Sequence, residues 1–101
     1  MSITPEKIQV ANNPERKRFE VVVDGHTAVC EYILTKTRII FTHTEVPKAL
    51  EGNGIGAKMA RFGLDYARAQ GLKVMPLCPF VASFIRKNPE YRDLLAAGVN
   101  V

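Results

Sequence analysis

The first half of the chain alternates between apolar and polar residues, as the strands of a half-buried sheet do. Residues 18–23 read Arg-Phe-Glu-Val-Val-Val and are followed by Asp-Gly, a dipeptide typical of two-residue hairpins. Residues 26–34 are the expected return strand, and residues 37–46, rich in β-branched side chains, are a third. With an earlier short strand over residues 7–10, this pattern predicts an antiparallel meander.

The second half of the chain changes period. From residue 55 the apolar side chains recur at three- and four-residue spacing, which predicts an amphipathic helix. Gly71 stands where a glycine commonly ends such a helix, and Pro79 suits the first turn of another. The expected elements are a helix from residue 55 up to Gly71, a strand over residues 72–77, a helix over residues 80–87 and a last helix from Asn88-Pro89 to about residue 97.

These elements predict the fold class. A strand, a helix and a strand in succession form a crossover unit whose two strands run parallel. The chain is therefore expected to be α+β, with a mixed, mostly antiparallel sheet, an N-terminal meander, a βαβ crossover helix and C-terminal helices. A chain of 101 residues has room for one core, so residues 1–101 are expected to form a single domain.

The amino-acid composition indicates a globular protein and excludes a disordered chain or a membrane-spanning one. The hydrophobic fraction of 47% and charged fraction of 24% match a soluble globular protein and exclude wholesale disorder. No run approaches the roughly 18 apolar residues of a membrane span. The net charge of +4 favours a phosphate-bearing ligand or an acidic surface.

The cysteines bear on the cellular compartment, and the cysteines and histidines together bear on metal binding. Cys30 and Cys78 cannot form the disulfide framework of a small secreted domain, and the N-terminal residues lack a signal-peptide pattern. A reducing, cytoplasmic compartment is therefore expected. The two histidines and two cysteines lack zinc-site spacing, so no metal site is expected.

The segment Glu-Gly-Asn-Gly-Ile-Gly-Ala-Lys, residues 51–58, lies between the third strand and the crossover helix. Glycines let the backbone approach a ligand, and a helix N-terminus offers free N–H groups, so a phosphate or pyrophosphate is the natural occupant. The residues that flank Lys58 do not fit a P-loop, and no acidic residue ends the next strand as a dinucleotide fold requires. An ordinary glycine-rich turn is the alternative.

The motif Glu51-x-x-Gly54-x-Gly56, after a strand that ends in Val46, resembles the pyrophosphate loop of the GNAT superfamily of N-acetyltransferases, [QR]-x-x-G-x-[GA]. The resemblance spans about residues 7–95. The chain looks most like the small GNAT-like branch of roughly one hundred residues. Three segments carry that closer resemblance, namely His43-Thr44-Glu45-Val46, Pro76-Leu77-Cys78-Pro79-Phe80-Val81 and Asn88-Pro89.

This resemblance implies a site for acetyl-CoA. In it the backbone of the glycine loop holds the pyrophosphate, and the backbone near Glu45 and Val46 pairs with the pantetheine arm. Glu51 departs from the family pattern, because its side chain cannot donate to phosphate. Basic side chains would meet the 3′-phosphate. The residues implied for the cofactor are Val46, Glu51, Gly52, Asn53, Gly54, Ile55, Gly56, Ala57, Lys58, Arg86 and Lys87.

Three residues are candidates for catalysis. Cys78 ends the second parallel strand just before a helix, where the helix dipole favours a thiolate, and the resemblance implies that it faces the acetyl thioester. A buried packing role is the alternative for Cys78, and core packing is expected for Cys30. Histidine is a common side chain for proton transfer near neutral pH, which makes His43 a candidate, and Glu45 shares its face of the strand.

The resemblance therefore implies an acetyl-CoA-dependent N-acetyltransferase that acts on an amine, either directly or through Cys78. The acceptor is a small molecule, a peptide or a protein lysine. The alternative is a non-catalytic module that binds coenzyme A or acyl-CoA. A nucleic-acid-binding domain is disfavoured, because no exposed aromatic array accompanies the positive charge.

Overall fold

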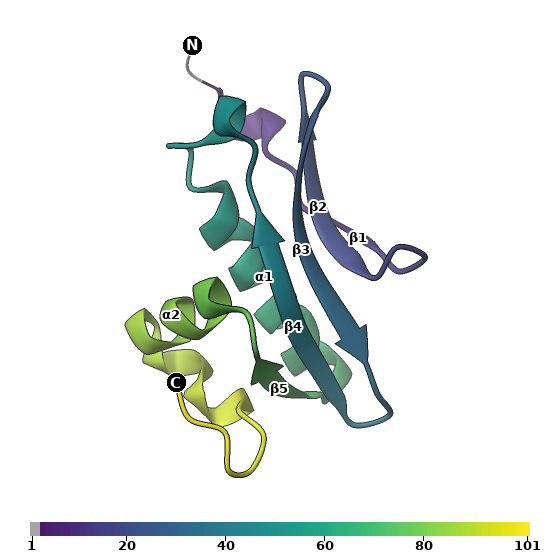
Figure 1. Cartoon of the computed structure of the whole chain (residues 1–101), viewed down its shortest axis with the longest axis vertical. Coiled ribbons are helices and arrows are strands. Elements are labelled where there is room, and N and C mark those ends of the chain that lie inside the picture. Colours follow the sequence, from purple (N-terminus) through teal and green to yellow (C-terminus); the bar gives the residue numbers. More distant parts are fainter. Residues whose placement is uncertain (1–2) are drawn as a thin grey trace.

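Five strands form one mixed sheet in which the order in space follows the order in the chain (Figure 1). The computed structural model describes residues 3–101. The strands are β1 (Ala11–Asn13), β2 (Arg18–Val23), β3 (His26–Leu34), β4 (Arg38–Glu45) and β5 (Lys73–Pro76). The helices are α1 (Ile55–Gln70) and α2 (Pro79–Lys87), with 3-10 helices η1 (Pro5–Lys7), η2 (Lys48–Leu50) and η3 (Pro89–Leu94).

The topology confirms the predicted α+β fold. Strands β1 to β4 pair antiparallel, and β5 pairs parallel with β4 after the α1 crossover. The hairpin between β2 and β3 turns at Asp24 and Gly25, whose φ angles are +50° and +79°. Two positive φ angles match the right-handed twist of the paired strands, which is why the Asp-Gly dipeptide is favoured there.

Two expected elements were wrong. The strand expected at residues 7–10 is absent, because Pro5 starts the 3-10 helix η1 and the first strand begins only at Ala11. The last helix is the 3-10 helix η3, which ends at Leu94 rather than near residue 97. Beyond it the chain pairs with β5 instead: the Ala96 N–H donates to the Val74 carbonyl at 3.0 Å.

Helix α1 packs against one face of the sheet through a buried stripe that includes Gly63. A Cβ atom at Gly63 would lie 2.8 Å from Cε1 of Phe41 and 2.9 Å from Cε2 of Phe19. Both of these rings are fully buried. The missing side chain therefore lets α1 lie directly on the aromatic core.

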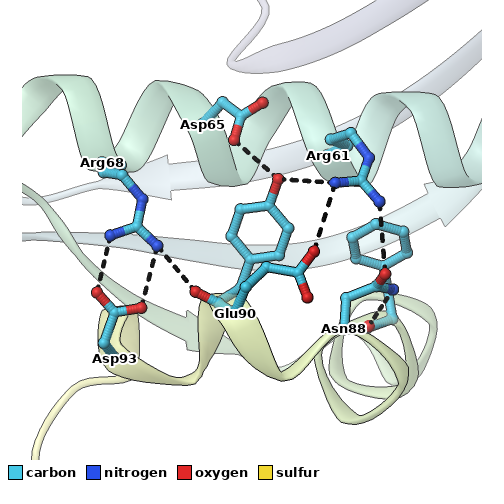
Figure 2. Close-up of polar contacts among 8 residues, drawn as sticks. Arg61, Asp65, Arg68, Asn88, Glu90 and Asp93 are labelled. Atoms are coloured by element: carbon cyan, nitrogen blue, oxygen red, sulfur yellow. Dashed lines mark hydrogen bonds and ion pairs between the residues drawn. The ribbon is translucent and has the colours of Figure 1, made fainter.

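Polar contacts hold η3 against the outer side of α1 (Figure 2). Arg68 donates to both carboxylate oxygens of Asp93, at 2.7 and 3.0 Å. The Tyr91 hydroxyl donates to Asp65 at 2.8 Å and accepts from Arg61 at 3.1 Å. Exposed ion pairs of this kind contribute little energy singly, so their main effect is to set where η3, and with it the end of α2, lies.

Candidate active site

A gap opens between β4 and β5 because their pairing is short. It runs from Arg38 opposite Lys73 to Phe41 opposite Pro76, and the Cys78 N–H then donates to the Phe41 carbonyl at 2.9 Å. Strand β4 continues to Glu45, so residues 42–45 have β3 on one side and, among the described residues 3–101, no strand on the other (Figure 1). Their outward backbone groups form an edge that an extended ligand can pair with.

The sequence explains why the strands part. On β4, Thr42 is an extra residue: Glu31 pairs with His43 and Tyr32 with Phe41, which leaves Thr42 in a bulge that bends the strand. On the other side, Pro79 starts α2 immediately after Cys78. A proline at the first helical position ends the extended segment, because it has no N–H for a sheet ladder.

The glycine loop ends at the uncapped N-terminus of α1. Gly52 and Gly54 adopt left-handed φ angles of +81° and +70°, which glycine adopts without strain. Gly54 is the N-cap residue, and no carboxylate stands in the first turn. The first helical bond runs from the Lys58 N–H to the Gly54 carbonyl at 3.0 Å, so the N–H groups of residues 55–57 have no capping side chain. Such a terminus favours an anion.

The side chain of Asn53 holds this loop in shape. Its Nδ2 donates to the carbonyls of Leu50 and Glu51, at 3.0 and 3.1 Å. Because the amide is engaged inside the loop, Asn53 offers a ligand its backbone rather than its side chain. Glu51 is exposed at the rim, where its carboxylate opposes an anion.

Two cavities adjoin the loop and share Phe80. The first, of about 250 Å³, gathers most of the residues expected to bind the cofactor; the second, of about 370 Å³, lies between α1 and α2. Lys87 lines the second cavity, whereas Arg86 and Lys58 line neither. The first is lined by Val46, Leu50, Glu51, Gly52, Gly54, Ile55, Gly56, Ala57 and Phe80, and the second by Ala57, Phe80, Ser83, Phe84, Lys87 and Asn88.

Gly56 has a packing reason to be glycine. Its φ angle is not left-handed, but a Cβ there would lie 2.7 Å from Cζ of Phe80. The glycine thus lets the Phe80 ring of α2 rest against the first turn of α1. Gly56 shapes the wall between the two cavities as well as offering a backbone N–H.

Cys78 lies where the sequence placed it, as the N-cap residue of α2, and it is 3% exposed. Its Sγ is 3.2 Å from the hydroxyl of Thr44, and the same hydroxyl is 3.7 Å from Sγ of Cys30. Cys30 is fully buried in the core, as predicted, and burial raises the pKa of its thiol to about 11. Thr44 was not among the predicted site residues, because only the pairing of Cys30 with Thr44 reveals that they share a face.

His43 and Glu45 lie on the opposite face of β4. Because side chains alternate along a strand, the inward position of Thr44 turns both of its neighbours outward. Both are exposed: His43 pairs across β3 with Glu31, and Glu45 pairs with Val29. They share one face, as expected, but it is not the face of Cys78. Their role in proton transfer stays a prediction.

Other kinds of site find no support in the described chain. Within residues 3–101, no group of three or more His, Cys, Asp or Glu side chains is placed to hold a metal ion. Over the same residues, no helix has both the length and the apolar character needed to cross a bilayer.

Comparisons with known proteins fit this geometry. The sequence profile of the GCN5-related N-acetyl-transferase family matches residues 18–94, from β2 to η3. The chain is 34% identical over 85 residues to Protein NATD1 of Gallus gallus, covering 81% of this chain and 77% of that protein. It is 33% identical over 85 residues to Protein NATD1 of Homo sapiens, covering 81% and 75%.

A solved structure shows the same fold. The solution NMR structure of a GCN5-like protein from Staphylococcus aureus superposes with a TM-score of 0.69. The match covers 89% of each chain at 23% sequence identity, so what the two share is the arrangement of strands and helices.

Proposed function

Since this chain belongs to the GCN5-related N-acetyltransferase family, we propose that it transfers the acetyl group of acetyl-CoA to an amine. The observation that carries the proposal is one juxtaposition. The unpaired edge of β4, residues 42–45, leads to a cavity of about 250 Å³ whose far wall is the uncapped N-terminus of α1. An extended arm with amide groups and a pyrophosphate at its end fits those two features.

The residues present suit that cofactor. The backbone N–H groups of residues 55–57 would bind the pyrophosphate, helped by the positive end of the α1 dipole. The backbone of residues 42–45 would pair with the pantetheine amides. Lys87, which lines the second cavity, would meet the 3′-phosphate, whereas the Arg61 guanidinium already donates to the Tyr91 hydroxyl. When bound, the cofactor supplies a thioester carbonyl that a nucleophile can attack.

Two routes lead to the same products. In the direct route the amine attacks the thioester, and His43 or Glu45, on the outer face of β4, accepts the proton that the amine loses. In the covalent route the Cys78 sulfur takes the acetyl group first, and the thiol proton leaves with coenzyme A. The amine then takes the acetyl group from Cys78. Either way an amide and free coenzyme A are formed.

A second candidate function has an observation in its favour. His43 and Glu45 face away from Cys78, so the acid–base groups and the thiol do not form one cluster. This arrangement suits a module that binds coenzyme A or acyl-CoA without catalysis.

Both cysteines are free thiols, which suits a reducing compartment, and the proposal places either function in the cytoplasm.

A matched pair of glycine variants tests the cofactor site. Gly54 and Gly71 flank the same helix with φ angles of +70° and +68°, and a Cβ atom added at either would have no neighbour within 4 Å. Valine at either position costs at least about 1–2 kcal/mol of backbone strain. Only Gly54→Val adds bulk to the loop, so it should abolish coenzyme A binding while Gly71→Val retains it. Equal affinity of the two variants in titration calorimetry contradicts the phosphate loop.

Acetyl transfer itself needs a separate measurement. Mass spectrometry of a panel of amines incubated with acetyl-CoA and the protein should show products that carry one acetyl group. Coenzyme A binding without transfer to any amine would favour the module instead. NAD and ATP should give no comparable heat of binding.

A further inference from the structure

The face of the sheet that turns away from α1 carries an apolar row. Side chains alternate along a strand, so the buried side chains of Tyr32 and Ile39 place Ile33 and Ile40 on the opposite face. The strand registers set Ile33 beside Ile40 and Ile40 beside Met75, which makes one continuous row across β3, β4 and β5. Ile33 is 49% exposed, and the other two are half-buried. The outer face of such a sheet is normally polar, so this row is unusual.

Opposite charges lie on the two sides of the apolar row. Toward the start of β4, Arg38 stands beside Lys73 of β5. Toward the end of β4, the next row holds Glu31, and Glu45 lies one row further along the strands. The outer face is therefore positive on one side of the apolar row and negative on the other.

Three of the charges on this face already have partners within the chain. Arg18 and Glu20 of β2 form an ion pair at 2.8 Å, and Lys73 donates to a backbone carbonyl of η3 at 3.3 Å. Within residues 3–101, no ion pair or side-chain hydrogen bond engages the side chain of Arg38 or Glu31. These two side chains are free to contact a partner.

A second copy of the chain matches this pattern by symmetry. A twofold axis along the apolar row lays the row of one copy on the row of the other and reverses the direction of the strands. Arg38 of each copy then lies across from the row that holds the partner's Glu31, one strand spacing to the side, which its long side chain can span. The same patch serves both copies, as an isologous interface requires, and an apolar centre with charged borders is the usual composition of an interface.

We propose that the chain forms a twofold-symmetric dimer through this outer face, with the apolar row at its centre. Four strands about 4.8 Å apart and four rows about 7 Å apart give a face of roughly 20 Å by 20 Å, or about 400 Å² in projection. Stable interfaces bury about 800 Å² on each partner. The dimer is therefore weak, and its population depends on the protein concentration.

The dimer does not require acetyl transfer, and it bears on the proposed function at one point. His43 stands beside Glu31 on the outer face and would be covered by the partner. Glu45 lies one row nearer the rim of the interface. In the direct route, Glu45 would then be the group that accepts the proton from the amine.

A matched pair of lysine variants tests the apolar row. Ile33 and Leu34 are neighbours with exposed fractions of 49% and 44%, but Leu34 pairs with the buried Ile39 and so faces the side of α1. Sedimentation velocity between about 10 µM and about 1 mM protein should show wild type passing from monomer to dimer. Ile33→Lys should weaken association at least tenfold, whereas Leu34→Lys should associate as wild type does. Circular dichroism checks that each variant is folded.

A mixture of two charge variants tests the symmetry. Arg38→Glu alone brings two carboxylates together at each end of the homodimer, and Glu31→Lys alone brings two cations together, so each should weaken association at least tenfold. An equimolar mixture should associate about as wild type does, because both ends of the mixed dimer then join opposite charges. Within one chain the two residues lie about 13 Å apart, beyond the screening length of about 8 Å at 0.15 M salt, so the recovery requires two copies.

Four results would overturn the proposal. These are a wild type that stays monomeric at about 1 mM, an Ile33→Lys variant that associates as wild type does, a mixture that associates no better than its components, or a growing series of species larger than a dimer. If Ile33→Lys does not fold, the mixture decides, because both of its components keep the apolar row. None of these readouts uses coenzyme A, so failure of the proposed transferase leaves them unchanged.

Discussion

Gly63→Ala should destabilise the protein although alanine is the better helix former. The new methyl group would lie 2.8 Å from the Phe41 ring and 2.9 Å from the Phe19 ring. Neither ring has free space, since both are fully buried. The centroid of the Phe19 ring also lies 4.8 Å from that of Tyr32 and 5.6 Å from that of Tyr66. Helix α1 must therefore move away from the sheet, or two rings must shift together.

The expected magnitude follows from two opposing effects. Adding a methyl group to a filled core costs about 1–3 kcal/mol, and two immobile rings place the cost at about 2–3 kcal/mol. Replacing glycine by alanine inside a helix recovers about 1 kcal/mol. The net loss of about 1–2 kcal/mol corresponds to a fall in Tm of about 4–16 °C for a chain of this size.

Thermal unfolding followed by circular dichroism measures the change, with Gly56→Ala as the matched control. That substitution lies in the same helix, and its methyl group would meet Cζ of Phe80 at 2.7 Å. The Phe80 ring is 43% exposed and can swing into solvent, so Tm should not fall. Coenzyme A affinity should weaken instead, because the displaced ring lines both cavities. A Gly63→Ala variant that melts at or above the wild-type temperature would refute the packing argument.

Two further predictions concern charge. The Arg68 guanidinium lowers the pKa of Asp93 below its ordinary value of 3.8, so the stability that this carboxylate contributes is fully present above that value and is lost as the pH falls through the lower folded-state pKa. Asp93→Asn should therefore lower Tm at pH 7, and the difference from wild type should vanish in melts taken stepwise to pH 2; a difference that is constant with pH contradicts this. Glu51→Gln removes a carboxylate from the rim of the first cavity and should tighten coenzyme A by about 0.3–1 kcal/mol in calorimetry. Weaker binding would mean that Glu51 holds the loop in place.

Much of the fold could be predicted because its signals are local. The Asp24-Gly25 turn, the glycine that ends α1 and the proline that starts α2 each restrict their own backbone, whatever surrounds them. The expected last helix failed where a local signal competed with a distant partner. After η3 the chain leaves the helix because the carbonyl of Val74 on β5 accepts from Ala96.

Some residues of the candidate site could likewise be identified from local sequence, and others could not. The loop glycines could be identified because Gly52 and Gly54 adopt left-handed backbone, a conformation that favours glycine over other residues. Thr44 could not, because nothing near it in the sequence places it between two sulfurs. The reason for Gly56 was equally hidden, since the ring that requires it belongs to the next helix.

The sequence by itself determined the order and type of the main elements, the glycine loop and the place of Cys78 at a helix start. These follow from residue periodicity and from backbone preferences, which act over a few neighbouring residues. Only the tertiary structure decided how β4 lies against β3 and β5. The bulge at Thr42 sets the register that brings Thr44 beside Cys30, and the short pairing with β5 opens the edge beside it. Both depend on contacts between residues far apart in the chain, so no local pattern encodes them.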